Sequence, residues 1–199
     1  MNAIAQLSRR PDHAVDPQFV GRWSPRAFTD ETMSEAQILA LLEAARWAPS
    51  AANMQPWRFA WGLRGDAAFA AIFDSLAPGN QAWAGRAAAL VVIGSKTTRQ
   101  TPEGAEAANG FHAFDAGAAW ANLALQAHLS GWAAHGMGGF DPAKLAAALN
   151  LAEGHALHAV AAIGRVGDPA ALPEALRSRE VPSGRKSLAE IAGHGAFPA

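Results

Sequence analysis

Residues 44–59, AARWAPSAANMQPWRF, contain the end of a predicted helix, a polar turn and the start of a predicted strand. The helix begins after Ser34, which has Gln37 three residues later in the pattern of a capping box. Apolar residues then recur at helical spacing and stop before Pro49, which disfavours helical backbone in the residue before it. Alternation over residues 57–62 predicts a strand. We therefore expect a helix, an irregular turn and a strand, in this order.

The turn between this helix and this strand carries polar groups next to aromatic side chains. Ser50, Asn53 and Gln55 offer hydroxyl and amide groups, and Trp47 and Trp57 flank them. Polar groups that converge beside aromatic walls suit a flat heteroaromatic ligand. A loop that ends the helix and is packed by the two tryptophans fits the same pattern, so both interpretations stay open at this point.

Two arginines and a serine alternate in the segment Arg22-Trp23-Ser24-Pro25-Arg26. Alternate side chains of an extended segment point to the same side, so Arg22, Ser24 and Arg26 can converge on one anion. Guanidinium groups match the oxygens of a phosphate well. Residues 12–30 contain prolines and a glycine that interrupt helical patterns, so we expect an extended arm with turns. A solvated arm without a ligand is the alternative interpretation.

The rest of the chain alternates between predicted helices, strands and loops. Helices are expected at residues 67–76, 80–86 and 109–129 and, after Asp141, as a short helix that begins with Pro142. Strands are expected at residues 88–94 and 156–166. The remaining segments are a polar loop at 97–108, a glycine-rich stretch at 135–140 and a tail at 172–199. The tail has few long apolar residues, so we expect it to wrap another subunit.

Composition limits the classes of function that the chain can have. It has 199 residues, 50% of them apolar, which fits one domain completed by a second copy. A net charge of -1 argues against a broad interface with nucleic acid. The absence of cysteine excludes disulfides, thiolate metal sites and cysteine nucleophiles. Polar residues interrupt the apolar stretch 111–132, and residues 1–13 lack the apolar run of a secretory signal, so we expect a cytoplasmic protein outside the membrane.

Three further patterns lack the partners that their chemistry needs. Ser183 and Lys186 match the S-x-x-K nucleophile pattern, but its companion motifs are missing. His155 and His158 have no evident third ligand, so no metal site is expected. Residues 136–139, GMGG, have neither the G-x-G-x-x-G nor the Walker spacing. They indicate either backbone that passes close to another group or a plain tight turn.

Taken in order, these stretches resemble the FMN-dependent nitroreductase family. Residues 22–28, RWSPRAF, are similar to its N-terminal R-x-S-x-R-x-F signature, and residues 48–57, APSAANMQPW, are similar to its A-P-S-x-x-N-x-Q-P-W motif. Asn80 resembles the flavin-facing asparagine of the family. Residues 136–139 occupy the place of its glycine-containing loop, and Arg185 with Lys186 that of its basic C-terminal ligands. The resemblance extends over nearly the whole chain.

The resemblance implies an α+β fold in which helices flank a mostly antiparallel central sheet. It also implies an intertwined homodimer with two FMN sites at the interface. Residues 1–199 would form a single domain, with residues 1–20 as an N-terminal arm and residues 172–199 as a C-terminal arm exchanged between subunits. One bound flavin would then employ the arginine segment, the donor-rich loop and the tail together.

The resemblance also implies roles for individual residues. The FMN phosphate would be held by Arg22, Ser24, Arg26, Arg185 and Lys186. Other flavin contacts would come from Trp23, Asn80, Trp83 and Met137 and, in the second subunit, from Ser50, Ala51, Asn53 and Gln55. The amides of Gly138 and Gly139 would lie near flavin N5 and O4, so no catalytic side chain is required. Ala51 and Trp83 depart from the family, where a serine and a basic residue are common at these positions.

The implied activity is hydride transfer from NAD(P)H through flavin N5 to an electron-poor acceptor such as a nitroaromatic or a quinone, in ping-pong alternation. The sequence lacks a dinucleotide-binding fingerprint, so the nicotinamide is expected to bind only transiently. A relative that uses reduced FMN for dehalogenation, flavin fragmentation or enone reduction is one alternative. A flavin-binding protein without turnover is another, and an interaction domain without a ligand is the third.

Overall fold

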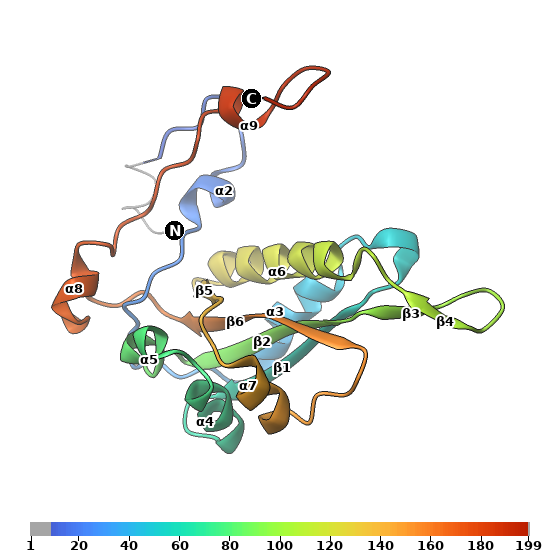
Figure 1. The fold of residues 1–199 in the computed structure, drawn as a ribbon. Coiled ribbons are helices and arrows are strands. Elements are labelled where there is room, and N and C mark those ends of the chain that lie inside the picture. Colours follow the sequence, from blue (N-terminus) through green and yellow to red (C-terminus); the bar gives the residue numbers. More distant parts are fainter. Residues whose placement is uncertain (1–8, 199) are drawn as a thin grey trace.

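The computed structural model describes residues 9–198 and has a central sheet between two layers of helices (Figure 1). The four strands of this sheet are antiparallel to their neighbours and follow the order β1 (Trp57–Leu63), β2 (Ala89–Lys96), β6 (His155–Gly164) and β5 (Ala133–Met137). The predicted α+β fold with an antiparallel sheet is therefore confirmed. Residues 1–8, the first part of the predicted N-terminal arm, and Ala199, the last of the C-terminal arm, lie outside the described residues.

The side chains of β2 alternate between two hydrophobic cores, one on each face of the sheet. On one face, Val91 and Ile93 belong to the core formed with α3 (Glu35–Arg46) and α6 (His112–Leu129). On the other face, Leu90 and Val92 belong to the core formed with α4 (Ala67–Asp74), α5 (Pro78–Ala84) and α7 (Pro142–Ala148). A strand buried on both faces needs such a continuous apolar run, which is why the sequence made β2 easy to predict.

Capping residues begin α3 and α7 where the sequence predicts, whereas α5 begins at Pro78, two residues earlier than expected, and α6 at His112, three residues later. At α3, the amide of Gln37 donates to Ser34 Oγ at 3.3 Å, and the amide of Ser34 donates to Gln37 Oε1 at 2.8 Å. At α7, Asp141 Oδ1 accepts from two amides of the first turn, and Pro142 occupies the first position. In the described residues, no helix combines the length and the apolar character needed to cross a membrane.

The predicted arm 12–30 and the glycine-rich stretch 135–140 are more regular than expected. The arm contains a short helix, α2 (Pro17–Gly21), because Asp16 Oδ1 accepts from an amide of its first turn at 3.0 Å and the proline starts the helix. The first half of the glycine-rich stretch belongs to the edge strand β5, and only residues after Met137 form a loop. The strand was not predicted because glycine is uncommon in strands and therefore favours a turn or loop in a sequence-based prediction.

The expected polar loop 97–108 is a hairpin. Strands β3 (Thr98–Gln100) and β4 (Glu106–Ala108) pair antiparallel to each other, apart from the main sheet. Gly104 supplies the positive φ of its turn. The prediction of a loop was wrong because these strands are polar and bury little, so they show no apolar alternation and only their backbone hydrogen bonds define them.

The two ends of the chain run side by side away from the layered body (Figure 1). After η2 (Pro169–Ala171), the C-terminal segment contains α8 (Glu174–Arg177) and α9 (Leu188–Ile191). Leu172 and Glu180, in its first part, are buried against their own chain. The side chains of α9 are exposed, so the last part gains little from the chain to which it belongs.

Candidate functional site

A cavity of about 320 Å³ lies where the arginine segment meets the C-terminal segment. Five arginines line it: Arg9, Arg22, Arg26, Arg179 and Arg185. Ser24 lines it too, and Arg22 Nη1 donates to Ser24 Oγ at 3.3 Å. The alternation of the segment thus brings Arg22, Ser24 and Arg26 to one cavity, as predicted. No sequence pattern predicts a role for Arg9 or Arg179, because they lie outside any motif.

The positive charges around this cavity repel one another and are partly shielded from water. Burial and the neighbouring Arg185 lower the pKa of Arg22. Burial likewise lowers the pKa of Arg9, with Arg185 and Arg22 contributing in the same direction. An anion would relieve this repulsion and accept hydrogen bonds from the guanidinium groups. The charges therefore fit a phosphate, which carries up to about two negative charges near neutral pH.

Glu180 holds the main chain of the arginine segment in place. Its side chain is 1% exposed, and its Oε2 lies 3.7 Å from Arg26 Nη1. Its Oε1 accepts hydrogen bonds from the amides of Arg26 and Ala27 at 2.6 and 2.7 Å. Glu180 thus fixes where Arg26 enters the cavity. Since 154 residues separate Glu180 from Arg26, no local pattern indicates this contact.

Arg9 ties the two chain ends together beside the cavity. Its Nη1 donates to the carbonyl oxygens of Val20 and Arg22 at 3.2 and 2.7 Å, and its Nε donates to that of Ser183 at 2.8 Å. The carbonyl of Val20 lies at the end of α2, where a positive charge is favourable. Arg9 thus fixes the backbone of Arg22 relative to the segment that carries Arg185.

The glycine loop after β5 contacts Asn80. Asn80 Nδ2 donates to the carbonyl oxygen of Gly139 at 2.8 Å, and a Cβ on residue 139 would lie only 2.9 Å from that nitrogen. Gly138 borders open space. Met137 and Trp83 are buried in the core with α4, α5 and α7. The loop therefore presents mainly backbone at the surface.

The donor-rich loop 50–55 has an unusual backbone. The short helix η1 (Ala51–Asn53) occupies it, and Ser50 Oγ accepts from the amide of Gln55 at 3.1 Å. Ala52, Asn53 and Gln55 have φ angles of 47°, 53° and 48°, in the left-handed region that residues other than glycine seldom adopt. Such clustered strain is typical of binding sites, where the surrounding structure enforces it.

This loop and the arginine cavity lie at opposite ends of α6. Asp115, buried in the first turn, accepts a hydrogen bond through Oδ2 from the amide of Ala51 at 3.2 Å. At the other end, His128 and Arg22 line a common hollow. A helix of 18 residues is roughly 27 Å long at 1.5 Å per residue. One chain therefore contains two predicted half-sites that it does not bring together.

The sequence profile of the Nitroreductase family matches residues 20–165, which include the arginine segment 22–26 and loop 50–55. The chain belongs to the nitroreductase family. A solved structure described as an oxidoreductase containing FMN is 42% identical and superposes with a TM-score of 0.93, covering 99% of this chain and 98% of that chain.

Two other relatives agree with this assignment. A protein from Desulfovibrio desulfuricans, described as a nitroreductase in complex with FMN, is 27% identical with a TM-score of 0.70 and covers 92% of this chain and 96% of that chain. A protein from Rhodopseudomonas palustris (strain TIE-1), named an NADH dehydrogenase/NAD(P)H nitroreductase, is 38% identical over 73 residues. That match spans 37% of this chain and 37% of the curated relative.

The remaining predicted residues of this nitroreductase lie in exposed parts of the tail. Arg185 Nη1 donates to the carbonyl oxygens of Ser183 and Gly184, at 3.4 and 2.8 Å, and Lys186 makes no hydrogen bond within residues 9–198. No three metal-ligating side chains gather in the described part of the chain.

His135, which lines the arginine cavity, is expected to make the stability of this nitroreductase depend on pH. Burial lowers the pKa of His135, although its Nδ1 donates to the carbonyl oxygen of Pro25 at 3.0 Å. The unfolded chain therefore binds this proton more readily than the folded chain once the pH falls below about 6.5. The free energy of unfolding should fall between pH 7.5 and pH 5.5, by at most about 1.4 kcal/mol per pH unit for this one group.

Urea denaturation of the wild type and of His135→Gln at both pH values measures this contribution. The variant should lose less stability on acidification, because glutamine does not titrate. His128 and His158, whose pKa values burial also lowers, remain in both proteins and cancel in the comparison. Equal losses in the two proteins would contradict the assignment to His135.

Proposed function

We propose that this chain is an FMN-dependent oxidoreductase that accepts a hydride from NAD(P)H and reduces an electron-poor acceptor such as a nitroaromatic or a quinone. The observation that carries the proposal is the set of five arginines around one cavity, which suits a phosphate. The 42% identical oxidoreductase contains FMN, and the Rhodopseudomonas relative is named for NAD(P)H. When bound, FMN supplies a two-electron carrier at N5.

In this proposal, residues from both ends of the chain hold the FMN phosphate: Arg22, Ser24, Arg26, Arg185 and Lys186. Glu180 keeps Arg26 at the cavity, and Arg9 keeps the two chain ends in register. Trp23 Nε1 is buried and has no hydrogen-bond partner in the described residues, so the indole can donate to a bound group.

The glycine loop supplies the electrostatic part of the proposal. Asn80 donates to the carbonyl of Gly139, which fixes this turn of backbone. The amides of Gly138 and Gly139 are proposed to stabilise negative charge at the reacting end of the flavin. Because backbone amides stabilise this charge, the proposal assigns no acid or base side chain of this chain to that role, and the protons that the acceptor takes up come from solvent.

In a homodimer, each half-site of one chain can meet the complementary half-site of the other chain. We place loop 50–55 of one chain at the flavin held by the arginine cavity of the other. Exposed apolar side chains surround the parts that would meet: Trp47, Phe111 and Phe114 near the loop, and Val181, Leu188 and Ile191 along the tail. Exposed large apolar side chains gathered on such segments are typical of interaction sites.

The visible spectrum of the purified protein, followed by steady-state oxidation of NADH and NADPH with a quinone acceptor, tests the proposal. We expect flavin absorption bands and turnover that depends on the quinone. Tight FMN binding without turnover would instead make the protein a flavin carrier. A protein that stays colourless with excess FMN, and whose melting temperature does not move, would contradict the proposal altogether.

A further inference from the structure

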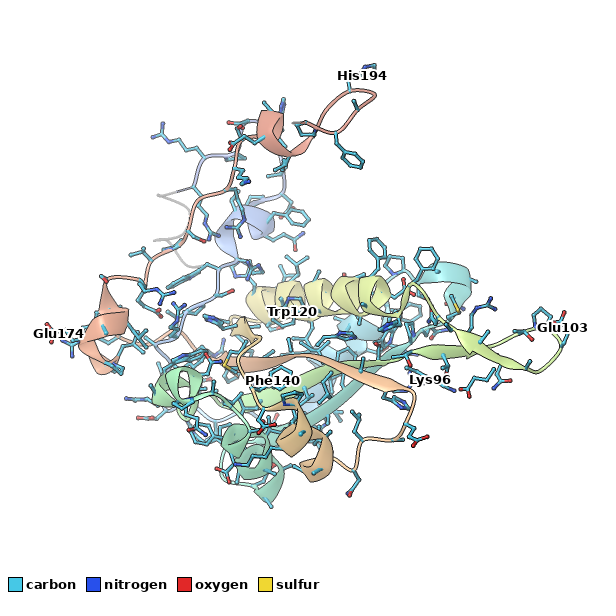
Figure 2. The ribbon with its side chains drawn as sticks, viewed as in Figure 1. Lys96, Glu103, Trp120, Phe140, Glu174 and His194 are labelled. Atoms are coloured by element: carbon cyan, nitrogen blue, oxygen red, sulfur yellow. The ribbon has the colours of Figure 1, made fainter. Side chains whose placement is uncertain are left out.

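A second, smaller cavity lies at the base of the β3–β4 hairpin. Its volume is about 230 Å³. Met54 and Pro56 form one wall, and residues from the end of β2 and from β3 form the other. Lys96 lies at the base of this hairpin and Glu103 toward its tip, far from the layered body (Figure 2). The cavity is thus separate from the arginine cavity at the other end of α6.

Cations dominate the lining of this second cavity. Arg58, Lys96 and Arg99 all line it, and no carboxylate is among its lining residues in the described part of the chain. Arg58 Nη1 donates to backbone carbonyls of the neighbouring loop, and Lys96 Nζ lies 3.7 Å from a carboxylate oxygen of Glu106. Arg99 makes no side-chain hydrogen bond or ion pair within residues 9–198. The three cations outnumber Glu106, the carboxylate that pairs with Lys96, so the cavity favours an anion.

Asn109 adds an unused donor to the same lining. It is 2% exposed, and its Oδ1 accepts from the amide of Phe111 at 3.0 Å, which fixes the orientation of the amide group. Its Nδ2 is buried and has no partner in the described residues. A buried donor left unpaired costs about 1 to 3 kcal/mol. A ligand oxygen that accepts from Asn109 Nδ2 would remove this cost.

The position of the cavity indicates which anion it takes. Met54 and Pro56 alternate along the loop with Asn53 and Gln55, two residues that we place at the flavin. A molecule that reaches both the flavin and this cavity must carry a phosphate some distance from its reacting ring. A nicotinamide dinucleotide has this property, and the chain has no dinucleotide fingerprint to bind it elsewhere.

We propose that the cavity lined by Arg58, Lys96, Arg99 and Asn109 binds a phosphate of the nicotinamide nucleotide that reduces the flavin. This inference rests on the proposed function. It makes the base of the hairpin the part of the chain that recognises the reductant. The nicotinamide itself needs only transient stacking on the flavin.

Steady-state kinetics of the FMN-loaded protein test the inference. Arg99→Gln and Lys96→Gln should each raise the KM for NADPH about fivefold, the effect of losing one partly solvated charge contact, while the Kd for FMN stays the same. Asn109→Asp, nearly identical in shape, should raise the KM at least as much, because it places a negative charge at the anion. Lys144→Gln, a matched loss of one positive charge in α7, outside the lining of the cavity, should leave the KM for NADPH unchanged.

Parallel measurements with NADH identify the phosphate. A KM that rises only for NADPH places the 2′-phosphate in the cavity, and a rise for both nucleotides places the diphosphate there. An unchanged KM for both nucleotides in Lys96→Gln and Arg99→Gln would overturn the inference.

Direct binding separates this inference from the proposed function. Calorimetric titration of the FMN-loaded protein with adenosine 2′,5′-bisphosphate and with ADP requires no turnover. Binding that is weakened in both Lys96→Gln and Arg99→Gln would support the phosphate site. If the wild type binds these probes but oxidises neither NADH nor NADPH, the proposed function is refuted and the phosphate site is not. If neither probe binds the wild type, the inference is overturned. The proposed function then still depends on the turnover measurement alone.

Discussion

Replacing Arg22 with alanine is expected to weaken FMN binding by about 1.5 to 3 kcal/mol, the scale of a charge-assisted hydrogen bond. This equals a rise in Kd of about tenfold to a hundredfold or more. Arg22 is half-buried, and Ser24 Oγ accepts from its Nη1 at 3.3 Å, so the guanidinium is already held at the cavity in the free protein. The substitution therefore removes a phosphate contact that is preorganised before FMN binds. Fluorescence titration of the apoprotein with FMN measures the change.

Riboflavin, which lacks the phosphate, provides the control for this variant. Its affinity should be the same in the wild type and in Arg22→Ala, because the lost charge would act only on the phosphate. A parallel loss of riboflavin affinity would mean that the substitution disturbs the whole site. Unchanged affinity for FMN would exclude Arg22 from the phosphate contacts.

The parts of the candidate site that depend on near neighbours in the sequence were predictable. Arg22, Ser24 and Arg26 lie within five residues, so extended backbone alone brings them to one side. The same holds for α3, whose start depends on Ser34 and Gln37. These features need no knowledge of tertiary structure, because covalent spacing and local hydrogen bonds determine them.

The parts that depend on distant contacts were not predictable. Glu180 binds the amides of Arg26 and Ala27 across more than 150 residues, and its polar surroundings in the sequence resemble an exposed tail. Arg9 has no motif, and its role depends on where the C-terminal segment runs. The polar hairpin of β3 and β4 is held by backbone bonds, which side-chain periodicity does not record. Tertiary geometry determines all three.

Ending the chain after Glu180 is expected to shift the protein from dimer to monomer and to remove FMN at the same time. The lost residues 181–199 include Arg185, which lines the arginine cavity, and the exposed apolar side chains of α9. The shortened chain keeps Glu180, so the amides of Arg26 and its neighbour remain bound and the arginine segment stays folded. Light scattering and visible absorbance of the shortened protein measure both losses.

The full-length variant Arg185→Gln separates the two effects, because it removes one charge and keeps the arm. It should bind FMN more weakly but remain dimeric. A shortened chain that is still dimeric and yellow would contradict the exchanged arm, and a yellow monomer would contradict a site shared between chains. Since α6 keeps loop 50–55 away from the arginine cavity of its own chain, a monomer has only half a site. FMN release on dilution of the full-length protein should therefore follow the same concentration dependence as dimer dissociation.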